Sequence, residues 1–145
     1  MKRKSVRIYS FTGTGSRLAL NLAEKLKQEG YVCTGYTVAR FAEDKRLQRL
    51  NDGWKQEIGA SWGEHALVFI GAAGIAIRAI APFVKDKFTD PPVIVLDEKG
   101  TFAIPLLSGH VGGGVTLAKV LAEYTGGRAV ITTATDVQKK FAADV

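Results

Sequence analysis

The chain has 145 residues, of which 46% are hydrophobic and 23% charged, a composition that favours one globular domain and excludes a disordered or fibrous protein. The single cysteine, Cys33, excludes an internal disulfide and a multi-cysteine zinc site, and the short apolar runs predict a cytoplasmic protein without membrane contact. The net charge of +6 indicates an anionic partner, and because basic and acidic residues alternate, we expect a small polyanionic substrate rather than nucleic acid.

Residues 6–11 alternate apolar and polar side chains, which predicts the first strand. From Arg17 onward, apolar residues recur at helical spacing until Gly30, which predicts an amphipathic helix. The loop between them contributes four candidate substrate-binding residues: Thr12, Gly13, Thr14 and Gly15. Its backbone N–H groups could hold a phosphate or carboxylate, but the loop lacks the third glycine of a dinucleotide fingerprint and the Gly-Lys-Ser/Thr of a P-loop. Ligand contact and a plain turn both remain open.

A second strand is predicted at residues 31–38, and a second helix at residues 43–58 with four large apolar residues on one face: Leu47, Leu50, Trp54 and Ile58. His65 precedes the continuous apolar run 66–70, which is typical of a central parallel strand. A residue that enters such a strand lies away from the ligand edge of the sheet, so we interpret His65 as structural.

The segment from Gly71 to Gly74 joins this strand to residues 75–84, which are apolar on nearly all sides and predict a short buried helix that bends or ends near Pro82. Because an unpaired buried charge is costly, we expect Arg78 in this helix to be paired or directed at an anion. The alternative is that its long stem reaches water. With Gly71 and Gly74, Arg78 is a candidate substrate-binding residue. The polar residues that follow predict a solvated loop: Lys85, Asp86, Lys87 and Asp90.

The next segments predict a hairpin, formed by a buried strand, a turn and a returning strand at residues 92–97, 98–100 and 101–104. A helix is predicted at residues 115–124, with the glycines at 126 and 127 as its stop. Residues 129–133 predict the strand that closes the sheet.

Between the hairpin and that helix, the sequence gathers a hydroxyl, an imidazole and several glycines: Ser108, Gly109, His110, Gly112, Gly113 and Gly114. Glycine permits close approach of the backbone to a ligand, and the free N–H groups of the following helix suit an anion or a developing oxyanion. The alternative is a tight turn in which Ser108 caps the helix and His110 lies at the surface. Asp136, just past the last strand, either orients a ligand or His110, or caps a helix.

These elements predict a three-layer α/β sandwich with a mainly parallel, Rossmann-like sheet and one inserted hairpin. Each glycine loop, at residues 13–15, 71–74 and 109–114, follows a predicted strand and precedes a helix. We therefore expect all three loops at one edge of the sheet, where open α/β sheets bind ligands.

Eight segments resemble those of a known family: Gly74-Ile75, 78–82, 85–87, 89–91, 95–100, 106–110, Gly112-Gly113 and 131–136. Over residues 6–145 the chain resembles the N-terminal part of the CbiG family, the cobalt-precorrin-5A hydrolases of anaerobic cobalamin biosynthesis. The resemblance implies that residues 1–145 form a single α/β domain. It also implies that the further C-terminal domain of family members is absent, so activity of this chain alone is a separate question.

The resemblance further implies a hydrolase that opens a δ-lactone on a cobalt-corrinoid polycarboxylate, after which a two-carbon fragment leaves as acetaldehyde. Cobalt then arrives with the substrate, and no cofactor is expected. Among the residues, His110 suits proton transfer near neutral pH, N–H groups around Gly112 and Gly113 suit an oxyanion, and Ser108 is a nucleophile or a hydrogen-bonding group. Implied partners are the substrate and a separate C-terminal domain or other pathway enzymes, without nucleic acid or membrane.

Two other classes of protein compete with this hypothesis. One is a non-catalytic corrinoid-binding or scaffold module that needs a partner domain for the chemistry. The other is a nucleotide-binding α/β domain that uses residues 12–16, against which the missing lysine and the lack of an acidic residue after the second strand count.

Overall fold

The computed structural model describes residues 4–107 and 113–133. Within these ranges the chain forms one seven-stranded sheet in the order β3-β2-β1-β4-β5-β6-β7. The strands are β1 Ser5–Ser10, β2 Val32–Thr37, β3 Leu47–Arg49, β4 Ala66–Ile70, β5 Val93–Leu96, β6 Phe102–Leu107 and β7 Arg128–Ala129. The first five run parallel to one another, β6 runs antiparallel to β5, and β7 runs parallel to β6.

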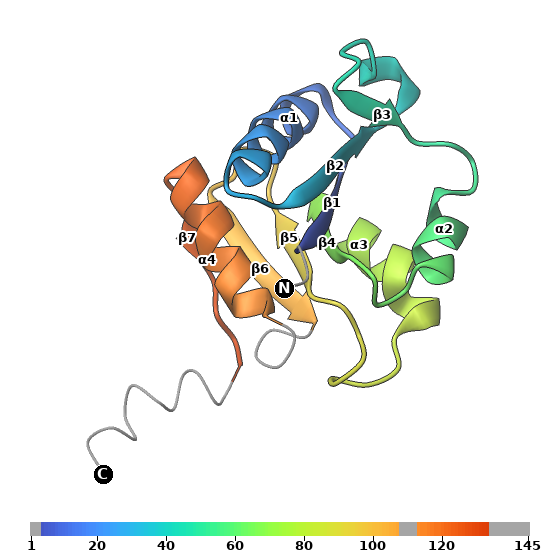
Figure 1. The fold of residues 1–145 in the computed structure, drawn as a ribbon, viewed down its shortest axis with the longest axis vertical. Coiled ribbons are helices and arrows are strands. Elements are labelled where there is room, and N and C mark those ends of the chain that lie inside the picture. Colours follow the sequence, from blue (N-terminus) through green and yellow to red (C-terminus); the bar gives the residue numbers. More distant parts are fainter. Residues whose placement is uncertain (1–3, 108–112, 134–145) are drawn as a thin grey trace.

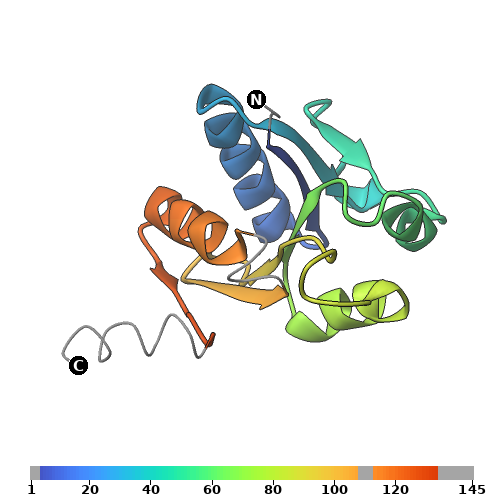
Figure 2. The same ribbon diagram turned by 60° about the horizontal axis from the view of Figure 1, so that its bottom comes forward.

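Helices cover both faces of this sheet, as the two views in Figures 1 and 2 show. One face carries α1 and α4, and the other carries α2 and α3. Their bounds are α1 Gly13–Gln28, α2 Trp54–Ala60, α3 Ala73–Ile80 and α4 Gly114–Thr125, with short 3-10 turns η1 Ala39–Phe41 and η2 Ala81–Phe83. The three-layer α/β sandwich with an inserted hairpin, β5 to β6, is thereby confirmed.

Two apolar cores result, one on each face of the sheet. Ile8 and Cys33 belong to the core under α1 and α4, where Leu22 is fully buried. Tyr9 and Phe69 belong to the core under α2 and α3. Because helices cover both faces, neighbouring residues of a central strand are all buried, which explains the continuous apolar runs in β4 and β5.

The predicted helix at residues 43–58 is wrong in its first part. Leu47 begins strand β3, and only residues 54–60 are helical. Leu47 packs where Gly35 leaves room on β2, since a Cβ atom at Gly35 would lie 2.7 Å from Leu47 Cδ2. Leu47 and Ile58 therefore contribute to cores on opposite faces of the sheet. Pairing with β2 outweighs the local helical spacing.

Other boundaries also differ from expectation. Helix α1 starts at Gly13 and α3 at Ala73, so both glycine loops run into the first helical turn. Helix α3 does end before Pro82, but it is not buried all round, because the Ile77 side chain is 51% exposed. A closing strand beside β6 is present, but β7 at Arg128–Ala129 shares one residue, Ala129, with the predicted range 129–133.

The loop before β5 is not uniformly solvated. Asp90 is only 6% exposed, and its carboxylate accepts hydrogen bonds from the Lys85 backbone N–H and from Trp62 Nε1 at 2.9 and 3.0 Å. A buried carboxylate is stable when such donors surround it. Asp90 therefore fixes the return of the chain from η2 to β5.

The expectation that all three glycine loops share one edge of the sheet is wrong. The loops at residues 13–15 and 71–74 follow β1 and β4, which end side by side. Strand β6 runs the other way and ends with Leu107 beside Val93, the first residue of β5. Gly113, at the start of α4, is likewise remote from the Gly100 turn, which contacts the last residue of α4, Thr125. The reversal at the hairpin accounts for this difference.

Candidate functional site

The sheet has a topological switch point between β1 and β4. The two strands are neighbours, but the chain leaves β1 for a helix on one face, α1, and leaves β4 for a helix on the other, α3. The crevice outside such a point is where open α/β sheets bind ligands. The glycine loops at residues 13–15 and 71–74 both border this crevice.

The loop after β1 is held by groups of the protein itself. The Thr12 hydroxyl accepts a hydrogen bond from the Gly15 N–H at 2.9 Å and donates one to the Glu98 carboxylate at 2.8 Å. Gly15 is buried close to β4, and a Cβ atom there would lie 3.0 Å from Thr12 Oγ1 and 3.4 Å from Ile70 Cγ2. Thr12 and Gly15 thus cap and pack the helix, and Glu98 places a negative charge beside its N-terminus.

The loop after β4 has no such cap. Gly71 has a φ of +150°, a conformation that favours glycine, and its N–H donates to the Leu96 carbonyl at 2.8 Å. The N-cap residue of α3 is Ala72, which has no side-chain oxygen to accept from the helix. Gly74 lies beside the guanidinium of Arg78, since a Cβ atom at Gly74 would be 3.2 Å from Arg78 Nη1.

A groove of about 440 Å³ runs along this edge on the side of α2 and α3, lined by Phe11, Val38, Ala39, Leu50, Asn51, Asp52, Trp54, Lys55, Ile75 and Arg78. It combines an aromatic wall, Phe11 and Trp54, with two cations, Lys55 and Arg78. Asp52 is the carboxylate in its lining. The groove can therefore hold a ligand that is apolar in one part and anionic in another.

Arg78 is exposed rather than buried, and it forms no ion pair with any carboxylate in the part of the chain that the structure describes. Its stem does reach water, as the alternative interpretation held. Its guanidinium remains at the groove beside Gly74, so a role in anion binding stays a prediction.

An aromatic cluster supports the wall of the groove. Tyr9 stacks between Tyr36 and Phe69, with ring centroids 5.2 and 5.1 Å away, and lies 5.7 Å from Trp54. Trp54 in turn lies 5.6 Å from Phe11. Burial raises the pKa of Tyr9 to about 12, so its hydroxyl stays protonated near neutral pH. The wall is thus backed by stacked aromatic rings with the neutral Tyr9 at their centre.

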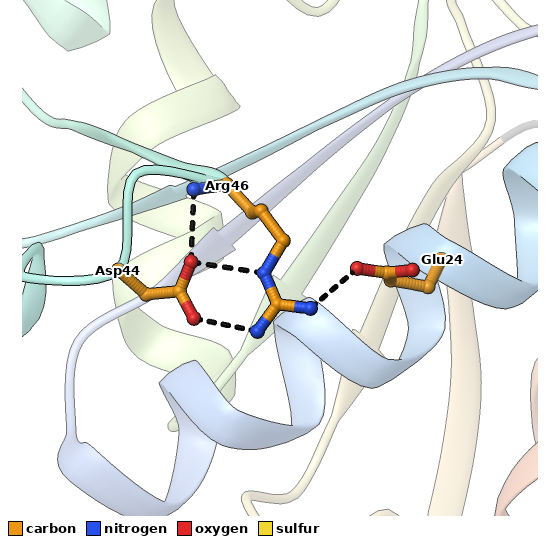
Figure 3. A network of polar contacts seen from close by, with 3 residues as sticks. All are labelled: Glu24, Asp44 and Arg46. Atoms are coloured by element: carbon orange, nitrogen blue, oxygen red, sulfur yellow. Dashed lines mark hydrogen bonds and ion pairs between the residues drawn. The ribbon is translucent and has the colours of Figure 1, made fainter.

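Other charges are already engaged within the protein. Arg46 donates to Asp44 at 2.7 Å and to Glu24 on α1 at 2.8 Å, which ties the segment before β3 to that helix (Figure 3). Hydrogen bonds from Arg46 lower the pKa of Asp44 to about 2. All three side chains are well exposed, in agreement with the solvated faces expected from the sequence.

The remaining predicted site residues are only partly described. Ser108, Gly109, His110, Gly112 and Asp136 lie outside the described residues. Gly113 is described, with a left-handed φ of +86° at the N-cap of α4. Residues 12–15, Gly71, Gly74 and Arg78 lie at one edge of the sheet. Gly113 lies at the opposite edge.

His65 also lies at that opposite edge, at the start of β4. Its Nδ1 is 2.6 Å from Ser5 Oγ, and desolvation, followed by the charge of Arg7, lowers its pKa. These contacts agree with the structural interpretation of this histidine.

Sequence reasoning missed three groove residues, Phe11, Trp54 and Lys55. The sequence placed Trp54 on the apolar face of a predicted helix and pointed to no role for Lys55. The available signal was the position of Phe11, which directly precedes the first glycine loop and so had to reach the ligand edge.

The fold and the groove define an open, doubly wound α/β domain with a groove at its switch point. Comparison with known sequences carries this further: the family described as "Cobalamin synthesis G N-terminal" (CbiG_N) matches residues 58–136. The chain belongs to this family. The resemblance stated from the sequence is confirmed.

Relatives of known name support the same conclusion. The chain is 40% identical over 154 residues to a cobalt-precorrin-5A hydrolase of Salmonella typhimurium, covering 99% of the chain and 40% of the relative. A cobalt-precorrin-5A hydrolase of Priestia megaterium is 32% identical over 149 residues, covering 99% of the chain and 39% of the relative. The chain thus spans about 40% of the length of these relatives.

A solved structure shows the same fold. The crystal structure of a cobalamin biosynthesis protein G homolog from Sulfolobus solfataricus superimposes with a TM-score of 0.68 at 25% identity, covering 92% of this chain and 39% of the other. In the described part of the chain, no helix is long and apolar enough to cross a membrane.

Proposed function

We propose that this chain acts in cobalamin biosynthesis as part of a cobalt-precorrin-5A hydrolase, which opens the δ-lactone of the corrinoid and releases acetaldehyde. The observation that carries the proposal is the 40% identity to the Salmonella typhimurium enzyme across 99% of the chain. The switch-point groove with Arg78 and Lys55 supports it, because the substrate is a polycarboxylate and both cations are exposed.

In the proposed reaction, water adds to the lactone carbonyl and the ring oxygen leaves as an alkoxide that takes up a proton. The step needs a base for the water and donors for the tetrahedral oxyanion. We assign the base to His110, with Ser108 as a hydrogen-bonding group and N–H groups around Gly112 and Gly113 for the oxyanion. Cobalt belongs to the substrate in this proposal, and the chain needs no cofactor of its own.

The groove and the proposed base are separate elements of this proposal. Leu107 and Gly113, which flank the segment of His110, lie at the edge opposite to the groove. Binding and proton transfer are therefore tested by different variants.

The proposed activity is tested by incubating cobalt-precorrin-5A with the chain, alone and together with the remaining portion of a curated relative. Mass spectrometry then measures acetaldehyde. We expect acetaldehyde in at least the combined reaction, at a rate that depends on this chain. The full-length relative serves as the positive control. If it releases acetaldehyde but the chain combined with the remaining portion does not, the proposal is contradicted.

The role of His110 is tested by His110→Asn, which keeps a donor but cannot accept a proton near neutral pH. We expect turnover to fall about 100-fold while substrate affinity changes little. The matched control is His65→Asn at the structural histidine, which should retain turnover. If His110→Asn turns over at the wild-type rate, the base lies elsewhere, in the part of the relatives that this chain does not match.

A further inference from the structure

The groove presents one aromatic wall and two cations that the protein does not neutralise by ion pairing. Phe11 and Trp54 meet at an interplanar angle of 49° and are both partly exposed. Lys55 Nζ lies 5.6 Å from the centroid of the Trp54 ring, and in the described part of the chain neither Lys55 nor Arg78 pairs with a carboxylate. Asp52 is the one opposing charge among the lining residues.

This arrangement selects for a particular ligand shape. Aromatic side chains offer a large apolar surface to a flat ring, whereas exposed guanidinium and ammonium groups bind carboxylates at its rim. A small inorganic anion would use the cations but not the wall. A flat macrocycle with peripheral carboxylates would use both.

The neighbouring loop argues against a nucleotide as the occupant. In dinucleotide-binding sheets the phosphates lie at the N-terminus of the helix after β1. Here the Thr12 hydroxyl and the Glu98 carboxylate occupy that end of α1, and the carboxylate repels a phosphate. The free end at this crevice belongs to α3, next to Arg78.

The wall is also backed by further aromatic rings. Tyr9 packs against Trp54 from below and is itself held between Tyr36 and Phe69. A preorganised surface loses little conformational entropy on binding, which favours a defined ligand orientation.

We propose that the groove seats part of the corrinoid ring against Phe11 and Trp54, with carboxylates of the ring periphery bound by Arg78 and Lys55. The inference rests on the proposed function for its ligand and adds the orientation of the ring and two residues, Phe11 and Trp54, as determinants of affinity. With about 440 Å³, the open groove covers part of such a ring and leaves the rest accessible.

The test measures binding by titration calorimetry with two stable cobalt corrinoids. Dicyanocobyrinic acid carries free carboxylates around the ring, and dicyanocobinamide carries amides at the corresponding side chains. Stacking should act on both ligands, whereas charge recognition should act on the first alone. Trp54→Leu and Phe11→Leu should weaken both ligands by about 5-fold to 10-fold, the effect of one aromatic contact. Arg78→Gln and Lys55→Gln should weaken dicyanocobyrinic acid by about 10-fold and leave dicyanocobinamide unchanged.

Matched controls come from the same fold. Phe102→Leu removes an aromatic ring that is 46% exposed on β6, and Arg17→Gln removes an exposed cation of α1 outside the groove. Both should leave the two affinities unchanged. Trp54→Tyr keeps an aromatic face and should retain affinity, which separates loss of stacking from loss of the fold.

The inference is overturned if the leucine variants bind as the wild type does, if the controls lose as much affinity, or if the wild-type chain binds neither corrinoid. Tighter binding of ATP than of dicyanocobyrinic acid would overturn it as well. Acetaldehyde release tests the proposed function separately, since it measures the reaction itself and not the binding of stable corrinoids to the groove.

Discussion

The two glycine-rich loops at the switch point follow parallel neighbouring strands, yet their helices begin in opposite ways. At α1, Thr12 caps the helix and binds Glu98, so the protein satisfies its own backbone donors and adds a carboxylate. At α3, Ala72 provides no cap, and the cation of Arg78 lies beside Gly74. We call the first loop closed, because a side chain of the protein caps its helix, and the second loop open, because no side chain caps the start of α3.

The difference shows that glycine content alone does not identify a binding loop. What matters is whether side chains of the protein already engage the N–H groups at the start of the helix. The following substitutions test this comparison.

The largest effect is expected for Gly71→Val in the open loop. A β-branched residue does not adopt a φ of +150° without strain, and we expect a loss of about 2 kcal/mol or more in the free energy of unfolding. Gly13→Ala is the control in the closed loop, because a Cβ atom there would make ordinary contact with Phe41 at 3.5 Å. Urea titration of both variants checks this. Equal stabilities would show that the open loop is not conformationally constrained.

A smaller loss is expected for Thr12→Val, which removes the cap of α1 and the hydrogen bond to Glu98. The usual cost of a lost N-cap is about 1 kcal/mol. Thr14→Val is the matched control, since that exposed hydroxyl only accepts a long contact of 3.4 Å from Arg17. Thermal unfolding of the two variants compares them directly. An equal loss from both would mean that the cap does not stabilise the closed loop.

The converse change, Ala72→Asp, should close the open loop. Ala72 already has the extended φ and ψ of an N-cap residue, so a carboxylate there should stabilise the protein by about 0.5 kcal/mol. The same charge should weaken binding of dicyanocobyrinic acid. Ala72→Ser adds a cap without charge and should weaken binding less than Ala72→Asp does. If Ala72→Ser and Ala72→Asp weaken binding equally, affinity depends on access to the start of α3 and not on the charge of the substituted side chain.

The smallest effect concerns pH and the turn that carries Glu98 to the closed loop. Burial tends to raise the pKa of Asp97, but hydrogen bonds from backbone N–H groups, including Phe102 at 2.7 Å, outweigh it and hold the pKa below the ordinary value of 3.8. A folded-state pKa below the unfolded one stabilises the protein at neutral pH, and this contribution disappears as the pH falls through the folded value. Asp97→Asn should therefore be less stable than the wild type at pH 7 and match it in acid. Urea titrations across this range would contradict the assignment if the difference stayed constant.

Much of the fold could be predicted because burial imposes its period on the sequence. The helix after β1 and the strands β4 and β5 each bury a regular set of apolar residues, and those patterns located them. The prediction of one helix over residues 43–58 was wrong because Leu47 and Ile58 have helical spacing in the sequence but pack on opposite faces of the sheet. Only the partner strand, with the space at Gly35, decides between the two structures.

The candidate site was less accessible to sequence reasoning. The glycine loops at residues 13–15 and 71–74 were placed correctly, since parallel strands end at one edge. The third loop was misplaced although the hairpin was predicted, because an antiparallel return necessarily carries the chain to the other edge. Phe11, Trp54 and Lys55 come together only through the tertiary arrangement of β1 and α2.

Cys33 lies in the core beneath α1 with 6% of its surface exposed, and burial raises the pKa of its thiol to about 11. A thiol of this kind is protonated and shielded in the native state, so alkylating reagents reach it only when β2 separates from α1. Because the chain has a single cysteine, the rate of its modification reports the opening of one defined place. The alkylation rate of Cys33 therefore measures local unfolding, and it can be followed in every variant named above without introducing a further cysteine.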